Sequence, residues 1–253
     1  MKKYGGQLIH HCRDEYGVIE VVDYKKIMRS LHFGNETQQS GMYQYDPIAL
    51  LHPYTQAMVS VTALQEPRRV LLLGVGGGSI VKFLIHHFRH INLDAVDLRR
   101  AVINIAQEYF YMPVHNRHLN IFVNDFKDFL VKAKQSNKVY DLILIDLFSA
   151  SKSENIIIGL DGQLKLIKSL LATNGFILIN VLASDISALS SLQELSALFA
   201  GTLYEIPVDG ANTVVLASNS CLKLFPTDTE FQYFEEKYAI SVRKYLLNMS
   251  ICA

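Results

Sequence analysis

The sequence predicts an α/β fold: a doubly wound, mostly parallel sheet with helices on both of its faces. From Arg69 onward, short apolar strand candidates alternate with segments of helix length, which is typical of such a sheet. The first of these, Val70–Leu73, is a continuous apolar run, as expected for a strand covered on both faces. Ligands of doubly wound sheets bind at the carboxyl ends of the strands, so the residues that follow each strand are the candidates for a functional site.

A different pattern precedes this sheet. Residues 17–24 and 26–33 are β-branched or aromatic and partly alternating, and the turn signal Gly34-Asn35 follows them, so we expect two paired antiparallel strands. A helix is expected from about Pro53 to Leu64, because proline is tolerated in a first helical turn. The chain therefore divides into an N-terminal β-strand appendage, residues 1–50, and a larger α/β domain, residues 51–253.

The alternation from Arg69 gives the order of the remaining elements. Strands are expected at 70–73, 92–96, 119–123, 142–145 and 176–180, with helices near 79–90, 99–110, 125–135, 161–172 and 187–199. Two final strands, 203–206 and 213–217, are separated by residues 207–210, which include a proline and a glycine. This separation suits an antiparallel connection, so the last strand of the sheet is expected to be antiparallel.

Length and composition restrict the class of protein further. Half of the 253 residues are apolar, which excludes extended disorder. Lys plus Arg and Asp plus Glu number 24 each, so the net charge is zero and binding to nucleic acid through bulk positive charge is not expected. The longest apolar runs fall far short of the roughly 20 residues that span a bilayer, and we expect no membrane association and no signal peptide. Three scattered cysteines indicate neither a disulfide framework nor a zinc site, and a cytoplasmic location is expected.

A glycine-rich loop follows the first strand of the sheet and opens a helix. It reads Gly74-Val-Gly-Gly-Gly-Ser79, and glycines at such a turn let the backbone approach a ligand. The alternative is that they serve only a tight strand-to-helix turn. Asp97 ends the next strand, 23 residues after Gly74, where a carboxylate can accept from both hydroxyls of a ribose. Asp125, after the third strand, could accept from an adenine amine or cap the following helix. Together these loops predict an adenosine site.

A third acid falls at the same edge of the sheet. Asp146 directly follows the strand Leu142–Ile145. A carboxylate there could position or deprotonate an amine or hydroxyl that faces the cofactor, which argues against a nicotinamide dehydrogenase with a similar glycine loop. The alternative is that Asp146 caps a helix or accepts a structural hydrogen bond.

Taken in order, these residues resemble the spermidine synthase family, the aminopropyltransferases built on the S-adenosylmethionine methyltransferase fold. The resemblance runs from about residue 16 to residue 218. Leu72 stands two residues before the first glycine, where an ordinary methyltransferase usually carries an acid and the spermidine synthases do not. The motifs that carry the resemblance are Tyr54 to Met58, Val70 to Gly78, Val96-Asp97-Leu98, Val123-Asn124-Asp125 and Tyr140 to Asp146.

This resemblance implies a methyltransferase-like, Rossmann-like sheet that uses decarboxylated S-adenosylmethionine or S-adenosylmethionine, no metal, and a small-molecule amine. It implies that Asp97 binds ribose, Asp125 binds adenine and Asp146 occupies the position of the catalytic base. The expected cofactor-binding residues are Gly74, Gly76, Gly77, Gly78, Asp97, Leu98 and Asp125. The expected substrate pocket contains Tyr54, Gln56, Phe148 and Ser149, although packing of an amphipathic helix would explain Tyr54 and Gln56 as well.

Two positions depart from the family's pattern. Gly77 stands where spermidine synthases usually have an acid within the glycine loop, and Ser149 replaces the second acid after the catalytic strand. A diamine carries two positive charges at neutral pH, and carboxylates offset its lost hydration. Losing such contacts costs about 1.5–3 kcal/mol for each charged hydrogen bond, so putrescine is expected to be a poor substrate. Phe148 also makes the pocket more apolar than the family's.

The first reading is therefore a transferase of polyamine biosynthesis that moves an aminopropyl group from decarboxylated S-adenosylmethionine to an amine. One alternative is a methyltransferase on the same scaffold. The other is a non-catalytic nucleoside-binding protein that kept the fold and lost the reaction.

Three further patterns receive simpler interpretations. His86 and His90 have metal-ligand spacing, but no acid lies in that turn, and histidines at a helix end complement its dipole. His10-His11 falls in a stretch that we expect to be irregular and at the surface. Aromatic residues in the segment 226–247 are expected to be core or homodimer contacts rather than a platform for nucleic acid.

Overall fold

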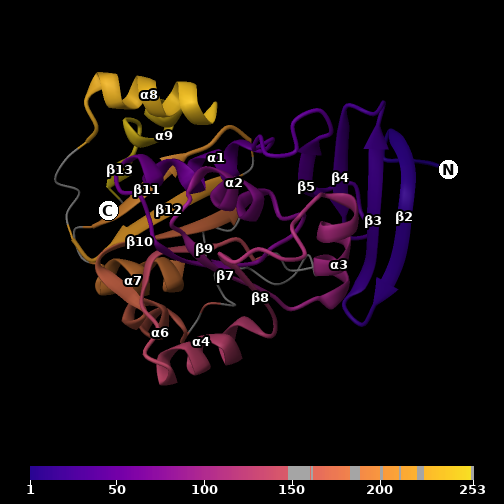
Figure 1. Cartoon of the computed structure of the whole chain (residues 1–253). Helices are drawn as coiled ribbons and strands as arrows, with labels where there is room; N and C mark the ends of the chain where they lie inside the picture. Colours follow the sequence, from indigo (N-terminus) through magenta and orange to yellow (C-terminus); the bar gives the residue numbers. More distant parts are fainter. Residues whose placement is uncertain are drawn as a thin grey trace.

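The computed structural model describes residues 1–147, 160, 162–182, 189–199, 202–210, 212–220 and 225–251. These residues form two sheets that lie side by side, a five-stranded sheet from the N-terminal part of the chain and an eight-stranded sheet from the rest (Figure 1). The boundary expected near residue 50 falls between the last strand of the first sheet and the first helix of the second unit.

The N-terminal sheet is antiparallel, and its strands follow chain order. One face packs on helix α3 (Arg100–Tyr109), where Ile19, Val21 and Leu31 meet Val102 and Ile105 in a shared apolar cluster. The strands are β1 (Lys2–Lys3), β2 (Gly6–Asp14), β3 (Gly17–Tyr24), β4 (Met28–His32) and β5 (Gln38–Tyr43).

The sequence pattern missed part of this sheet. His10 and His11 lie within β2, which pairs along its length with β3, so the expected irregular stretch is wrong. The buried carboxylate of Glu20 explains why these polar residues belong to a strand, since it accepts from Tyr4 Oη at 2.8 Å, contacts His11 Nδ1 at 3.0 Å and pairs with Lys3. Because polar residues of this segment contact a buried charge, the strand lacks the alternation of apolar and polar residues by which strands are usually recognised.

The central sheet has the mostly parallel, doubly wound topology expected from the sequence. In spatial order the strands are β13 (Ser250–Ile251), β11 (Leu203–Pro207), β12 (Asn212–Ser218), β10 (Leu171–Leu182), β9 (Tyr140–Ile145), β6 (Arg69–Leu73), β7 (Asn92–Asp97) and β8 (Leu119–Val123). The five strands from β10 to β8 in this order are parallel to one another. Strand β12 is antiparallel to both of its neighbours, β10 and β11.

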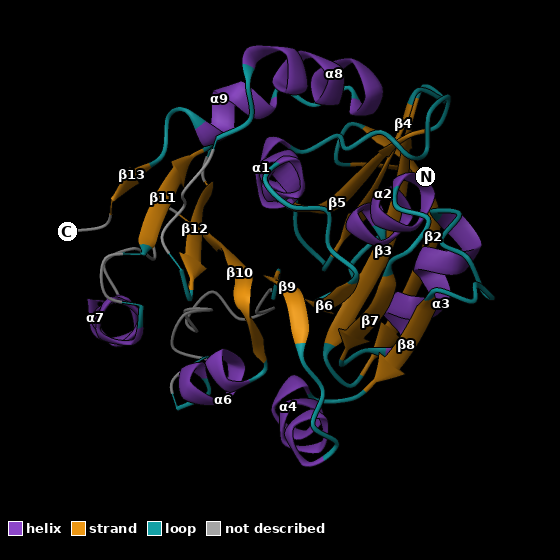
Figure 2. Cartoon of the chain, turned by 60° about the vertical axis from the view of Figure 1, so that its left-hand side comes forward, coloured by secondary structure: helices purple, strands orange, loops and turns teal. Residues whose placement is uncertain are grey.

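Helices cover both faces of this sheet (Figure 2). On the face shared with α3 lie α1 (Pro53–Ser60), a short 3₁₀ turn (Val61–Ala63), α2 (Ser79–His87), α8 (Asp228–Tyr238) and α9 (Val242–Leu246). On the other face lie α4 (Phe126–Gln135), α6 (Leu164–Ser169) and α7 (Leu189–Leu198). None of the helices in the described part of the chain is long and apolar enough to cross a membrane.

Several helix boundaries differ from the sequence-based expectation. Helix α2 ends at His87 instead of residue 90, and residues 171–172 belong to β10 instead of a helix. Helix α8 was not assigned, although Thr227 and Glu230 form a capping box at its start. Its aromatic residues Phe231 and Phe234 are buried in the core, in agreement with a packing role for this segment.

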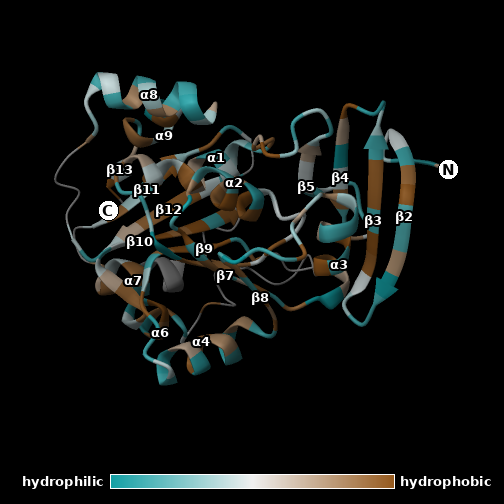
Figure 3. Ribbon diagram, viewed as in Figure 1, coloured by the Kyte–Doolittle hydropathy of each residue, from teal (hydrophilic) through white to brown (hydrophobic). Residues whose placement is uncertain are grey.

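The buried strands of the central sheet bring the candidate residues together. Brown, hydrophobic strands run through the middle of the molecule (Figure 3). Leu73 of β6 pairs with Val96 of β7 and Ile145 of β9, so these three strands end in register. The residues that follow them therefore meet at one edge of the sheet.

Candidate functional site

The glycine loop is fixed at the edge of the sheet by its neighbours. Gly74 N donates to Val96 O at 2.8 Å, and Asp146 N donates to Leu73 O at 2.8 Å. Gly74 has φ +92°, and a Cβ atom there would lie 2.0 Å from the carbonyl oxygen of Asp146. Only glycine fits this position, because any side chain would strain the backbone and collide with the residue after β9.

Ser40 of the N-terminal sheet closes over the same loop. Its Oγ accepts a hydrogen bond from Gly77 N at 2.8 Å, and a Cβ at Gly76 would lie 2.6 Å from it. The next residue of β5 takes part as well, since Ser79 Oγ donates to Gly41 O at 3.3 Å. The loop that the sequence assigned to the central domain is thus held by the appendage. Ser40 carries no motif that a sequence analysis would recognise.

The same packing limits what can stand at Gly77. A Cβ there would lie 2.9 Å from Ser40 Cβ and 3.2 Å from the Phe110 ring. We expect Gly77→Asp, the residue usual in spermidine synthases, to lower the free energy of unfolding by about 1–3 kcal/mol through overpacking. Thermal or denaturant unfolding measures this loss. In a Ser40→Gly background, Gly77→Asp should lower the free energy of unfolding by less than it does in the wild-type chain, because the Ser40 side chain is no longer there. An equal loss in the two backgrounds would contradict the packing argument.

Asp97 lies at the end of β7 and contacts the glycine loop directly. Its Oδ2 accepts from Val75 N at 3.0 Å and its Oδ1 from Arg99 N at 2.9 Å. Burial raises the pKa of this carboxyl group, and the amides that donate to it oppose the rise. The side chain remains partly exposed, and Leu98 beside it is 42% exposed.

Arg99 links this end of β7 to the N-terminal sheet. Its guanidinium donates to both carboxylate oxygens of Asp14, at 2.8 and 3.0 Å, and lies 4.5 Å from the centre of the Phe33 ring. Two parallel hydrogen bonds to one carboxylate are geometrically specific. The ion pair therefore fixes the end of β2 against the strand end that carries Asp97.

Asp125 caps helix α4. Its Oδ1 accepts from Lys127 N at 2.7 Å, which is the geometry of a helix N-cap. The capping alternative raised by the sequence is therefore observed. The side chain is partly exposed, and an adenine contact stays a prediction alongside this capping role.

Asp146 is the centre of a chain of polar side chains. Asn180 Nδ2 donates to its Oδ1 at 2.8 Å, and Asn212 Nδ2 donates in turn to Asn180 Oδ1 at 2.9 Å. From the opposite side, Tyr54 Oη donates to Asp146 Oδ2 at 3.2 Å. Burial raises the pKa of Asp146 to about 6, against the effect of these two donors. The pKa of Tyr54 is raised well above its usual value by burial and by the Asp146 charge, so the phenol stays protonated and donates.

A small cavity of about 10 Å³ adjoins this group. That volume is close to the minimum that holds one water molecule. Its lining comes from the N-terminal sheet, α1, the glycine loop and the end of β9. The lining residues are Ser40, His52, Tyr54, Thr55, Leu72, Gly74, Val75, Ser79, Ile80 and Asp146.

The other expected pocket residues are placed differently. Gln56 does not line this cavity: its Nε2 donates to Leu50 O at 2.9 Å and its Oε1 accepts from Tyr245 Oη at 3.4 Å. Phe148 and Ser149 lie outside the described residues. Asn180 and His52, which the sequence analysis did not select, lie beside Asp146 and in the cavity wall respectively. Asn180 is the last residue of the strand expected at 176–180, so its position at a strand end was the signal that could have found it.

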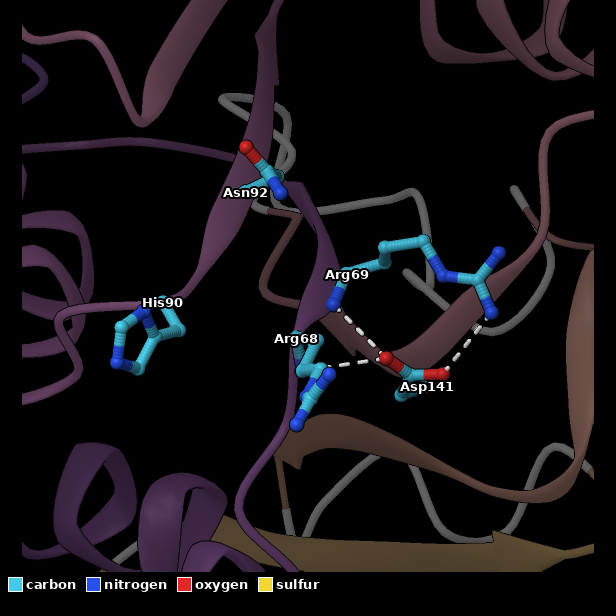
Figure 4. Close-up of a pocket in the computed structure, with 5 residues that line it drawn as sticks. All are labelled: Arg68, Arg69, His90, Asn92 and Asp141. Atoms are coloured by element: carbon cyan, nitrogen blue, oxygen red, sulfur yellow. Dashed lines mark hydrogen bonds and ion pairs between the residues drawn. The ribbon is translucent and has the colours of Figure 1, made fainter.

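A larger hollow of about 590 Å³ lies at the opposite edge of the sheet, among the amino ends of β6, β7 and β9 (Figure 4). It is lined by Arg68, Arg69, His90, Asn92 and Asp141. Asp141 accepts from the backbone nitrogens of Arg68 and Arg69, at 3.1 and 2.9 Å, and pairs with the Arg69 guanidinium. Its carboxylate thereby fixes the start of β6 beside β9.

The histidine pair at the end of α2 does not form a helical face, because the helix ends at His87 and His90 lies beyond it. His86 instead contacts the His87 ring at 4.7 Å between centroids. Within the described ranges, no three His, Cys, Asp or Glu side chains gather closely enough to hold a metal ion.

Proteins with similar sequences include polyamine aminopropyltransferases and eEF1A lysine and N-terminal methyltransferases. The chain is 29% identical over 192 residues to the polyamine aminopropyltransferase of Chromobacterium violaceum, covering 75% of this chain and 72% of that protein. It is 25% identical over 251 residues to the enzyme of that name from Vibrio vulnificus, covering 96% of this chain and 81% of its relative. No protein-family model matches the sequence.

Solved structures with the same fold include two kinds of transferase. A spermidine synthase in complex with the transition state analogue AdoDATO has a TM-score of 0.67 at 14% identity, with 94% of this chain and 84% of that chain covered. Human methyltransferase-like protein 13 in complex with SAH has a TM-score of 0.64 at 22% identity, with 76% and 92% covered.

The sheet order, the glycine loop and the acids at the carboxyl ends of β7 and β9 define an α/β protein of the methyltransferase fold. Within that class the chain is a divergent relative of the polyamine aminopropyltransferases, the spermidine synthase family.

Proposed function

We propose that this chain transfers an aminopropyl group from decarboxylated S-adenosylmethionine to a small-molecule amine. The observation that carries the proposal is the buried Asp146, held by Tyr54 and Asn180 at the edge where the glycine loop and Asp97 also lie. The names of the sequence relatives support the same reaction.

The fit of a nucleoside rests on the loop and on Asp97. The glycine loop follows β6 and opens α2 at the carboxyl edge of the sheet, where the amides at the start of a helix favour an electron-rich ligand. Asp97 accepts from the backbone amides of Val75 and Arg99, one on each oxygen. A carboxylate oxygen can accept from more than one donor, and a ribose hydroxyl would supply the further one. Leu98 and Asp125 would complete the adenosine contacts, as apolar surface and as an acceptor.

Asp146 accepts a proton from the acceptor amine, and Tyr54 holds the Asp146 carboxylate in place through a hydrogen bond. The bound sulfonium compound supplies an electrophilic methylene carbon beside its positive sulfur. The lone pair of a neutral amine forms the C–N bond while the C–S bond breaks and its electron pair goes to sulfur. Asp146 takes the proton that the amine nitrogen must lose, and its raised pKa suits this task. The thioether product leaves uncharged, so no acid is needed for the leaving group.

A methyltransferase is the second candidate, favoured by the fold shared with human methyltransferase-like protein 13. Calorimetry with decarboxylated S-adenosylmethionine, S-adenosylmethionine and methylthioadenosine separates the two. The proposal expects tighter binding of the decarboxylated compound and methylthioadenosine release with at least one of a panel of mono-, di- and triamines. Preference for the carboxylated compound would favour methyl transfer. Binding without turnover would favour a non-catalytic nucleoside-binding protein.

A further inference from the structure

His52 lies in the wall of the cavity beside Asp146. It is the N-cap residue of α1, and its carbonyl oxygen accepts from both Thr55 N and Thr55 Oγ1, at 3.1 and 2.7 Å. Its ring stacks on the Tyr54 ring, with 5.8 Å between centroids and 22° between planes. Since Tyr54 in turn donates to Asp146, the imidazole is held next to the proposed proton acceptor.

The Nε2 atom of His52 is buried and has no hydrogen-bond partner among the described residues. Leaving a buried polar atom unsatisfied costs about 1–3 kcal/mol, so such an atom in a native fold calls for a ligand or a water. Two other side chains, Gln39 and Arg243, also carry such an atom, but neither lines this cavity. Within the described part of the chain, His52 is therefore the only residue that lines this cavity and also carries a buried polar atom without a hydrogen-bond partner.

The size and lining of the cavity suit one nitrogen atom of a substrate. Its volume of about 10 Å³ admits a water-sized group, and a primary amine nitrogen has similar dimensions. Asp146 is the single carboxylate among the described lining residues, and Ser40 and Tyr54 add hydroxyl groups. Gly41 makes room for the imidazole, because a Cβ there would lie 3.0 Å from Nε2.

The ionisation of His52 is compatible with binding an amine. Burial lowers its pKa, so the ring is uncharged at neutral pH and does not repel a cation. A neutral imidazole protonated on Nδ1 offers the Nε2 lone pair as an acceptor. The nitrogen of a primary amine has at least two N–H donors, enough for Asp146 and for this atom.

We propose that His52 Nε2 and Asp146 together bind the reacting nitrogen of a primary amine in this cavity, so that His52 is a substrate-binding residue. The inference rests on the proposed function and extends it. A neutral acceptor here contributes to amine binding in a chain that has glycine and serine at two acidic positions of its relatives' pattern.

The experiment uses His52→Phe, which keeps an aromatic ring against Tyr54 and removes both nitrogens. His52→Gln places an amide near the position of Nε2, and His90→Phe is the matched control at the opposite edge of the sheet. His52→Ala replaces the phenylalanine variant if thermal unfolding shows that Phe is not accommodated. Calorimetry measures methylthioadenosine binding, followed by titration of the nucleoside-saturated protein with butylamine, putrescine and spermidine.

We expect His52→Phe to weaken amine binding about tenfold and to raise the amine KM by a similar factor, while methylthioadenosine affinity changes less than twofold. His52→Gln should recover part of the loss, and His90→Phe should behave as wild type. Equal amine binding by wild type and His52→Phe would overturn the proposal, as would the absence of binding by all three amines. Amine binding that depends on His52 but leads to no methylthioadenosine release would contradict the proposed transfer and leave this subsite standing.

Discussion

Asp146→Asn is expected to lower kcat for methylthioadenosine release by about 10²–10⁴-fold, while the affinity for methylthioadenosine stays within twofold. An amide has nearly the shape of the carboxylate and can keep the hydrogen bond from Asn180, which is 2.8 Å long in the native chain. It has no basic lone pair to take a proton from an amine. Turnover within tenfold of wild type would remove the role of proton acceptor.

The raised pKa of Asp146 gives the same substitution a second consequence. Since the pKa is about 6 in the fold and its ordinary value is 3.8, the folded state binds the proton more tightly than the unfolded chain does. The ionised carboxylate therefore destabilises the fold above pH 6, and this cost disappears as the pH falls below about 4. Asp146→Asn should raise the free energy of unfolding at pH 7.5 by about 1–3 kcal/mol, and the gain should vanish near pH 4.

Wild-type kcat should fall in parallel as the pH drops through about 6, because the base form is lost. A pH–rate profile checks this directly. A neutral variant that is inactive but more stable would identify Asp146 as a residue retained for chemistry at the expense of stability.

Asp97→Ala should weaken methylthioadenosine binding by about 1.5–3 kcal/mol, which corresponds to roughly 10- to 150-fold in Kd. The substitution removes the acceptor for ribose and also frees Val75 N and Arg99 N, to which Asp97 is bonded. Asp141→Ala is the matched control, since Asp141 also accepts from two backbone amides but at the opposite edge of the sheet. Both variants should lose stability, and only Asp97→Ala should lose nucleoside affinity. An unchanged Kd in a folded Asp97→Ala protein would exclude the ribose contact.

The parts of the fold that could be predicted are those whose signal is local in sequence. The strand 70–73 is apolar throughout and is followed by Gly74, and Asp97 and Asp146 were selected because each stands at the carboxyl end of an expected strand. The convergence of these residues at one edge follows from parallel pairing in register. Their roles toward ligands remain predictions.

The missed parts depend on contacts between distant segments. Ser40 reaches Gly77 across 37 residues, and Tyr54 reaches Asp146 across 92, so no spacing rule reveals which atoms meet. His52 stands out only once its Nε2 is known to be buried without a partner. Strand β2 was missed because it lacks the usual alternation of apolar and polar residues, and its polar residue His11 contacts the buried Glu20 carboxylate instead.

The hold of the N-terminal sheet on the glycine loop has a consequence for cooperativity. Ser40 bonds to Gly77, and Asp14 bonds to Arg99 two residues after Asp97, so both strand ends of the proposed adenosine site depend on this sheet. Any ligand that requires this arrangement of the loop must stabilise the N-terminal sheet by the same free energy with which the sheet strengthens its binding. The stability of the N-terminal sheet and the affinity of the proposed site for a nucleoside are therefore coupled. Substitutions within β2, such as at Asp14, change the nucleoside affinity through this coupling.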